Sequence, residues 1–206
     1  KKKIIRKVIE ETGYQPSSQA QMLRTKKTKL VGVILPKIDS NTISREVAGI
    51  SDILTKKGYQ LILANTNNNI EEELKYLSLF KDNQVDGVIF IATILTKQHR
   101  DMLKEYKVPI VLLGQRLEGY PCIFQDDQKA AMTLTEQMVK TGSKFGYITV
   151  TDKDEAVGRK RMSGVEEILS KNKIEFGSEY VKCGDFTLES GYEKAGELFG
   201  EHPDID

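Results

Sequence analysis

The 206-residue sequence contains no tryptophan, only two cysteines and only two histidines. Cys122 and Cys183 have no metal-ligand spacing and lie in strand-like runs, which favours reduced, half-buried thiols over a disulfide or a metal site. His99 and His202 each stand alone on a polar stretch, which favours surface positions over metal ligation. We therefore expect no metal and no cofactor in this chain.

Long apolar segments are also missing. No run approaches the roughly 20 apolar residues that span a bilayer, and the three lysines at the start precede no signal-peptide pattern. We therefore expect a cytoplasmic protein without membrane contact. The sequence starts without Met and stops at HPDID with no terminating element, which indicates a piece of a longer chain.

Motifs of catalysis are missing as well. The sequence has no GxSxG elbow, Walker loop, GxGxxG fingerprint or zinc signature. The adjacent carboxylates Asp126 and Asp127 have no nearby His, third carboxylate or nucleophile in sequence, so sugar-hydroxyl acceptor or helix cap is favoured over acid–base work. We therefore do not expect an enzyme.

Charge is distributed unevenly. Residues 1–28 carry eight of the 31 basic side chains and two of the 30 acidic ones, which gives +6. The other 178 residues then carry 23 basic and 28 acidic groups, which gives −5. A basic arm on a mildly acidic body indicates that only the arm meets a polyanion, the alternative being a solvated terminal helix.

The basic arm reads as two helices. Apolar residues recur with helical spacing over residues 2–12, and Gly13 ends that segment. Pro16 and the serines after it introduce a second segment over 17–24, only about two turns long. So short a helix is marginal alone in water, and we expect it to need a partner.

From residue 29 onward, apolar strands alternate with amphipathic helices. Repeated β–α–β units with apolar strands predict parallel sheets covered on both faces, with ligands beyond the carboxyl ends of the strands. The expected strands are 30–35, 60–65, 85–91, 109–113, 122–125, 145–150 and 179–184. The expected helices are 43–57, a helix capped by Asn69, 96–106, and helices over about 128–141, 159–172 and 187–199.

Polar side chains gather where several of these strands end. Lys37, Asp39 and Asn41 follow the first strand, in a loop whose groups can hold a polyhydroxylated ligand. The alternative is an Asx turn in which Asn41 or Thr42 caps helix 43–57.

Two further strand ends carry a candidate cation and a candidate aromatic. Arg161 ends a basic trio predicted at a helix N-terminus, where cations oppose the helix dipole, so either a hydroxyl-rich or anionic ligand or a solvated basic turn explains it. Phe186 follows strand 179–184, where it can stack on a sugar ring or pack in the core.

These pieces, in this order, resemble the lactose-repressor family of bacterial regulators. The stretch IIRKVIEETGYQPSSQAQMLRTKKTKLVGVILP is similar to that family's last headpiece helix, hinge helix and first core strand, and NQVDGVIF, PIVLLGQ, RMSGVEEIL and GDFTLESGYEKA resemble later landmarks. The resemblance implies an α/β fold like that of periplasmic sugar-binding proteins, with two doubly wound parallel-sheet subdomains and an N-terminal helical DNA-binding remnant. The implied division is 1–28 for the headpiece end and hinge helix, 29–142 for the first effector-binding subdomain, and 143–206 for an incomplete second one.

The resemblance also implies roles for single residues. Leu23 matches the hinge leucine that wedges into the minor groove of operator DNA, Ala20 matches its neighbour, and Arg24 lies in the same DNA-contacting segment. Arg161 matches a sugar-hydroxyl arginine, and Phe186 matches an aromatic that lines the effector pocket. The chain departs from the family where the usual Asp-Asn pair is Asp126-Asp127.

The implied function is a repressor of a sugar-utilisation operon, acting as a homodimer and controlled by a sugar or sugar phosphate between the subdomains. The alternative is a transport-type sugar-binding protein, against which the basic arm counts. The runs ILPKIDS, FQDDQKA and VGRKRMSG resemble family members that respond to a phosphorylated disaccharide such as trehalose 6-phosphate. Lys37 would then stand beside the phosphoryl group.

Overall fold

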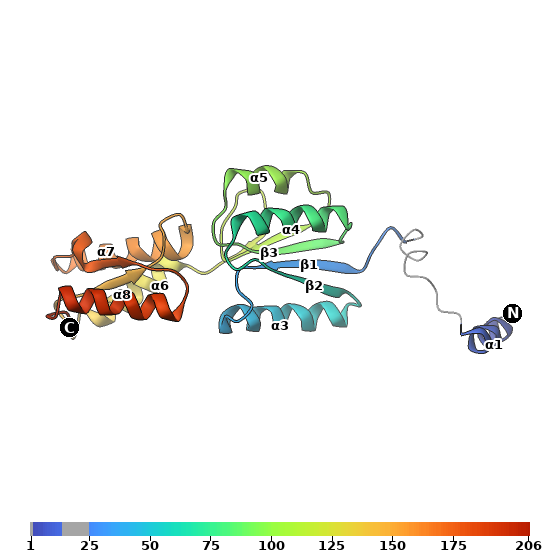
Figure 1. The fold of residues 1–206 in the computed structure, drawn as a ribbon, viewed down its shortest axis with the longest axis horizontal. Coiled ribbons are helices and arrows are strands. Elements are labelled where there is room, and N and C mark those ends of the chain that lie inside the picture. The colour runs from blue at the N-terminus through green and yellow to red at the C-terminus, as the bar shows by residue number, and fades with distance from the viewer. Residues whose placement is uncertain (1, 14–24) are drawn as a thin grey trace.

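The structure, a computed structural model, describes residues 2–13 and 25–206 (Figure 1). Its first element is the helix α1 (Lys2–Thr12), which agrees with the predicted helix over 2–12. The predicted second helix over 17–24, with Ala20, Leu23 and Arg24, lies outside the described residues.

The first lobe is a five-stranded parallel sheet. The strand order is β2-β1-β3-β4-β5, so the first strand lies inside the sheet, with β2 on one side of it and β3, β4 and β5 on the other. The strands are β1 (Leu30–Leu35), β2 (Gln60–Asn65), β3 (Gly87–Ile91), β4 (Ile110–Leu113) and β5 (Cys122–Ile123). The predicted strands 122–125 and 109–113 are therefore present in shortened form.

Helices cover both faces of this sheet, as the apolar strands predict. The helix α3 (Asn41–Lys56) packs on one face, where it contacts Val33 and Leu35. The helices α4 (Ile70–Asp82) and α5 (Lys97–Lys104) pack on the other, against Ile34 (Figure 1). Successive residues of a strand point to opposite faces, which explains how β1 serves both layers.

Helix caps confirm one prediction and correct another. Asn69 caps α4, and its side chain accepts hydrogen bonds from the backbone N–H groups of Glu71 and Glu72. The cap of α3 is Ser40, whose hydroxyl accepts from the N–H of Ile43. The alternative in which Asn41 or Thr42 caps this helix is wrong, because the helix begins at Asn41 and its cap is the preceding residue.

His99 lies inside the first lobe, so its predicted surface position is wrong. Its side chain is fully buried, with Nε2 3.1 Å from a carboxylate oxygen of buried Glu73 on α4, and its ring packs on Phe90. Its Nδ1 lies 2.8 Å from the hydroxyl of Thr96, the residue that caps α5. The short polar helix places His99 and Leu103, one turn apart, on the face toward the sheet.

The second lobe has its own sheet. The strands β6 (Tyr147–Thr149) and β7 (Val181–Cys183) pair with each other in parallel and with no strand of the first sheet. The strands expected over 85–91 and 145–150 therefore lie in separate sheets. The lobe also contains α6 (Asp127–Met138), the π-helical segment η1 (Glu155–Lys160), α7 (Arg161–Lys171), the 3-10 turn η2 (Ser178–Tyr180) and α8 (Leu188–Glu201). Cys183 is exposed and Cys122 half-buried, both as free thiols, so the half-buried prediction fits only Cys122.

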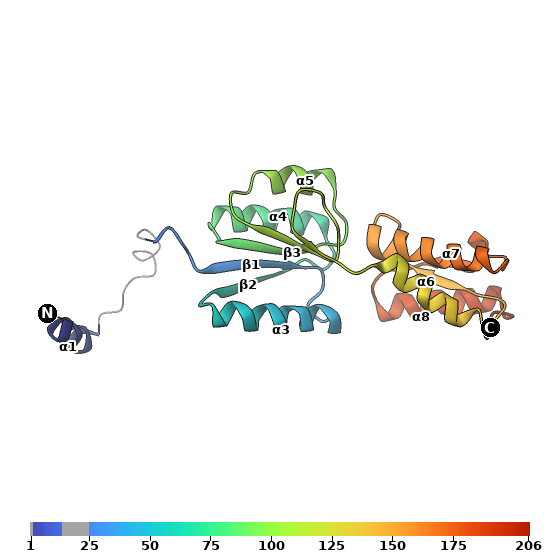
Figure 2. The same cartoon turned by 180° about the vertical axis from the view of Figure 1, so that it is seen from behind.

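The helix α6 packs in the second lobe, although the predicted division at 142 assigned it to the first. Figure 2 shows it beside α7. Ala131 and Val139 pack against the cluster around Phe145 and Leu169, and the backbone of α6 approaches Gly164 of α7 so closely that a Cβ there would lie 2.5 Å from the Gln128 carbonyl oxygen. We therefore propose that the lobes divide near residues 124–126, where the chain first crosses.

Gly32, in the centre of β1, tests the packing of this core. A Cβ at Gly32 would lie 2.3 Å from the ring of Phe80, which is buried beneath it. Gly32→Ala should therefore lower the free energy of unfolding by about 1–3 kcal/mol, because the ring must shift in a filled core. Urea denaturation measures the change.

The matched control is Gly49→Ala on α3, where an added Cβ would meet nothing within 4 Å. That substitution should raise the free energy of unfolding by about 0.5–1 kcal/mol, since alanine favours helix over glycine. The same sign for both variants would contradict the packing described.

Candidate ligand-binding site

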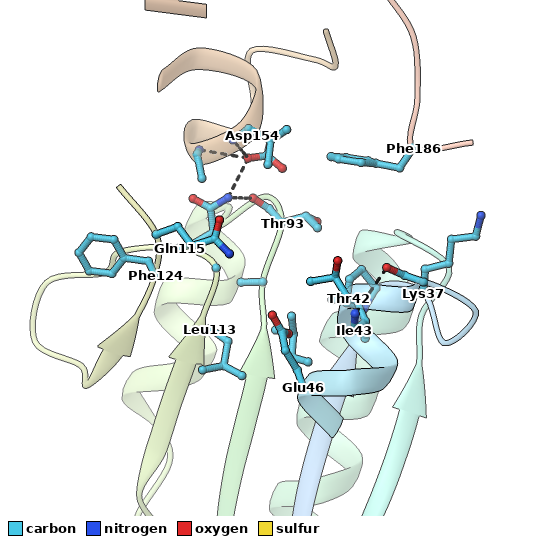
Figure 3. A pocket seen from close by; sticks show the side chains of 18 of the residues that line it. Lys37, Thr42, Ile43, Glu46, Thr93, Leu113, Gln115, Phe124, Asp154 and Phe186 are labelled. Atoms are coloured by element: carbon cyan, nitrogen blue, oxygen red, sulfur yellow. Dashed lines mark hydrogen bonds between the residues drawn. The ribbon is translucent and has the colours of Figure 1, made fainter. Parts of the chain in front are cut away.

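A cavity of about 580 Å³ lies between the two lobes, within the range of small-molecule sites. Residues at the carboxyl ends of β1, β3, β4 and β5 line one side, and residues that follow β6 and β7 line the other. Figure 3 shows Lys37, Thr42 and Glu46 on the first-lobe side, with Asp154 and Phe186 entering from the second lobe. This placement is what the strand-end rule for parallel sheets predicts.

Gln115 and Asp154 join the lobes across this cavity. The Gln115 side-chain amide donates to a carboxylate oxygen of Asp154 at 2.8 Å and to the carbonyl oxygen of Thr93 at 2.7 Å. The same Asp154 oxygen accepts from the backbone N–H groups of Ala156 and Val157, at 3.1 and 2.9 Å. Because Gln115 is 5% and Asp154 2% exposed, this network is shielded from water and holds one lobe on the other.

Asp154 also starts the helical segment that carries Arg161. The segment begins with η1 and continues into α7 without interruption, since Lys160 keeps helical backbone angles. Gly158 is required there, because a Cβ would lie 2.0 Å from the Thr151 carbonyl oxygen. Arg161 is the first residue of α7, as predicted, but the helical segment itself begins earlier, with Asp154 as the N-cap of η1, so Arg161 does not stand at the segment's free N-terminus.

Arg161 is oriented by Asp127. Its Nε donates to the Asp127 carboxylate at 2.7 Å, and Asp127 is buried while Arg161 is partly exposed. Among the described residues neither Nη atom has a hydrogen-bond partner, so the guanidinium presents N–H groups to the cavity that both residues line. The acidic residue therefore positions a cation that can bind hydroxyl or phosphoryl oxygen.

Two aromatic rings flank the cavity. Phe186 follows β7, and Phe124 follows β5, from the opposite lobe. Each side chain is 44% exposed, so neither ring is buried in a hydrophobic core. An exposed aromatic face beside hydrogen-bonding groups suits the apolar face of a sugar ring.

Glu46 is a cavity residue that the sequence analysis missed. Burial raises the pKa of its carboxyl group above the ordinary value, and its Oε2 is shielded from solvent with no hydrogen-bond partner among the described residues. The pattern of α3 held a signal for it, because Glu46 stands three residues after Ile43 and four before Ile50, on the apolar face.

The residues predicted for the site divide into two groups. Lys37, Asp127, Arg161 and Phe186 line the cavity. Asp39, Asn41 and Asp126 are not among its lining residues: Asp39 is exposed and 3.8 Å from the Lys37 ammonium group, Asn41 begins α3, and Asp126 caps α6. Besides Glu46, the polar lining residues that sequence reasoning missed include Thr42, Asn68, Thr93, Gln115 and Asp154.

No group of three or more His, Cys, Asp or Glu side chains within 2–13 and 25–206 is arranged to hold a metal ion. None of the helices in those ranges is long and apolar enough to cross a membrane.

Asp154 should contribute more to stability than Asp126, although both are aspartates that cap a helix. Asp154→Ala leaves two backbone N–H groups and the Gln115 amide without their acceptor in a shielded place. The free energy of unfolding should fall by about 2–4 kcal/mol, because each buried donor left unpaired costs about 1–3 kcal/mol. Chemical denaturation checks the value.

Asp126→Ala is the control, since the Asp126 side chain is exposed and, within residues 2–13 and 25–206, accepts a single hydrogen bond, from the N–H of Lys129 at 3.1 Å. Loss of that cap should cost about 1 kcal/mol. A smaller loss for Asp154→Ala than for Asp126→Ala would refute the interlobe network.

Comparison with known proteins agrees with this architecture. Residues 28–206 match the family described as periplasmic binding proteins and sugar binding domain of LacI family. The crystal structure of the transcription regulator CcpA of Lactococcus lactis superposes with a TM-score of 0.76 at 33% identity, covering 84% of this chain and 65% of that one.

Curated relatives are longer than this chain. The sucrose operon repressor of Staphylococcus xylosus is 31% identical over 169 residues, which cover 82% of this chain and 53% of that protein. Catabolite control protein A of Priestia megaterium is 33% identical over 205 residues, which cover 98% of this chain and 61% of that protein. With the two-lobed fold and interlobe cavity, these matches show that the chain belongs to the family of periplasmic binding proteins and LacI-family sugar-binding domains.

Proposed function

We propose that this chain is the effector-binding part of a sugar-responsive transcriptional repressor of the LacI family. In this proposal a sugar or sugar phosphate binds between the lobes and controls binding of operator DNA. The observation that carries it is the interlobe cavity, where the cation of Arg161, fixed by buried Asp127, faces the same space as the exposed ring of Phe186. Those are the groups that hold a polyhydroxylated ring.

The relatives support a repressor over a transport-type sugar-binding protein. Their printed names are those of an operon repressor and a catabolite control protein, and the second match extends over 205 residues. That length reaches into the basic segment 1–28, which a purely sugar-binding protein would not need. A cytoplasmic location and an activity that is regulatory rather than enzymatic follow from the same proposal.

The DNA-binding role rests on the segment outside the described core. Ala20 and Leu23 stand at the positions where family members meet the minor groove, and Arg24 adds a cation. Two such segments side by side imply a homodimer. The energetic logic is that a leucine wedge unstacks a base step and recovers that cost in added contacts.

Lys37 supports a more specific hypothesis, in which the effector is a sugar phosphate such as trehalose 6-phosphate. Its side chain lies at the rim of the cavity, with Asp39 as its only ion-pair partner among the described residues, at 3.8 Å. A phosphoryl group would replace that loose contact by a charge-assisted hydrogen bond. The finer hypothesis concerns the effector only, and the repressor proposal does not depend on it.

The experiment is a thermal-shift and calorimetric screen with sucrose, trehalose, maltose, cellobiose and trehalose 6-phosphate. A ligand at 100 times its Kd should stabilise the chain by about 2.7 kcal/mol. Arg161→Ala should abolish the shift for every sugar that binds, while the fold stays intact. Lys37→Ala should weaken the binding of a phosphorylated disaccharide about 10- to 150-fold and leave the affinity for its unphosphorylated parent almost unchanged.

The outcomes separate the two levels of the hypothesis. If trehalose binds as tightly as its 6-phosphate, the effector is a neutral sugar and the role given to Lys37 is wrong. If no sugar of the panel shifts the wild-type chain, the effector-binding proposal fails.

Leu23 tests the DNA arm in the full-length protein. Leu23→Ala should weaken binding to an operator selected from a random library about tenfold or more, because the wedge acts only where the groove opens. Binding to non-specific DNA, which rests on phosphate contacts, should change by less than about twofold. Gel-shift titrations at one salt concentration measure both, and equal losses would remove the wedge role.

A further inference from the structure

The wall of the cavity formed by α3 contains a carboxylate that the fold does not use. Within the part of the chain that the structure describes, Glu46 makes no hydrogen bond and no ion pair, and its Oε2 is out of contact with water. Figure 3 shows the carboxylate pointing from α3 into the cavity. A buried acceptor atom without a donor lowers stability. Its presence therefore indicates a role other than packing, such as binding a ligand.

The surroundings of Glu46 are apolar. Ile43 and Ile50 from its own helix and Leu113 from the end of β4 line the same part of the site. The other charged groups lining the cavity are Lys37, Asp127, Asp154 and Arg161. The two cations among them form their ion pairs with Asp39 and Asp127, and burial raises the pKa of the Glu46 carboxyl group.

The other carboxylates of the cavity are already satisfied. Asp127 accepts from the Arg161 guanidinium, and Asp154 accepts from two backbone N–H groups and Gln115. Glu46 therefore differs from both: it is the carboxylate of this cavity whose acceptor capacity is left for a ligand.

We propose that Glu46 is the acceptor that selects the ligand at the α3 wall, by taking a hydrogen bond from a hydroxyl group of the sugar ring. This inference rests on the proposed function and adds an orientation to it. A hydroxyl-bearing ring lies against α3, and any phosphoryl group lies away from Glu46, where a cation of the lining, Lys37 or Arg161, can bind it. An anionic or purely apolar group at the α3 wall would be rejected, because it would leave the carboxylate repelled or unpaired.

Three variants of the chain test this with the same five sugars. Glu46→Leu removes the acceptor and fills the wall with an apolar side chain, Glu46→Gln keeps an acceptor of the same shape, and Arg45→Leu changes an exposed neighbour on α3. Affinity for the sugar that stabilises the wild type most should fall about 10- to 100-fold in Glu46→Leu and less than about tenfold in Glu46→Gln, and should stay unchanged in Arg45→Leu.

Stability without ligand provides the second readout. Glu46→Leu should raise the melting temperature of the sugar-free chain by about 2–4 °C, since it removes a half-buried carboxylate whose Oε2 is shielded from water without a hydrogen-bond partner among the described residues. A residue that held the fold together would give the opposite sign. Higher stability together with weaker sugar binding is thus the result expected of a ligand-selecting group.

Each other outcome overturns the inference in a distinguishable way. If Glu46→Leu binds the sugars as the wild type does, Glu46 does not contact the ligand, and the proposed function stands without it. If the sugar-free Glu46→Leu chain melts at a lower temperature, Glu46 has a structural role. If no sugar of the panel stabilises the wild type, the proposed function fails and the inference falls with it.

Discussion

The hydrogen bond between Gln115 and Asp154 is the interaction on which the site depends. Each lobe has its own sheet and hydrophobic core, so the contact between the lobes is not part of either core. The cavity exists only where the carboxyl ends of the two sheets face each other, and the shielded Gln115–Asp154–Thr93 network lies at that junction. Because Asp154 also caps the helical segment leading to Arg161, the contact that joins the lobes also positions the principal cation of the cavity.

Several side chains that line the cavity are less stabilising than apolar core residues would be. Arg161 is held by a buried carboxylate, two phenylalanine rings remain exposed, and Glu46 has an acceptor with no donor. Departures of this kind from packing rules are expected at functional sites, where the ligand supplies the missing partners. The buried Glu73 and His99 side chains of the first lobe differ, because each lies within 3.1 Å of the other and the His99 ring packs on Phe90.

Local patterns predict local structure here, and fail where two distant segments meet. Strand alternation and the strand-end rule place Lys37, Asp127, Arg161 and Phe186 at the cavity, because the carboxyl ends of parallel strands share an edge. They cannot distinguish Asp127 from Asp126, since only the packing of α6 decides which carboxylate turns inward. They also cannot place α6, which follows the last strand of the first lobe while its apolar face packs on α7. Gln115 and Asp154 are single polar residues whose role exists only once the lobes touch.

The central claim is that a sugar binds between the lobes against groups from both. A crystal structure of the chain with its most stabilising sugar tests this most directly. The account predicts the sugar ring between Phe186 and α3, with Arg161 within about 2.7–3.2 Å of a ligand oxygen and the Gln115–Asp154 bond retained. A sugar found elsewhere on the molecule, or lobes separated with Arg161 turned to solvent, would contradict it.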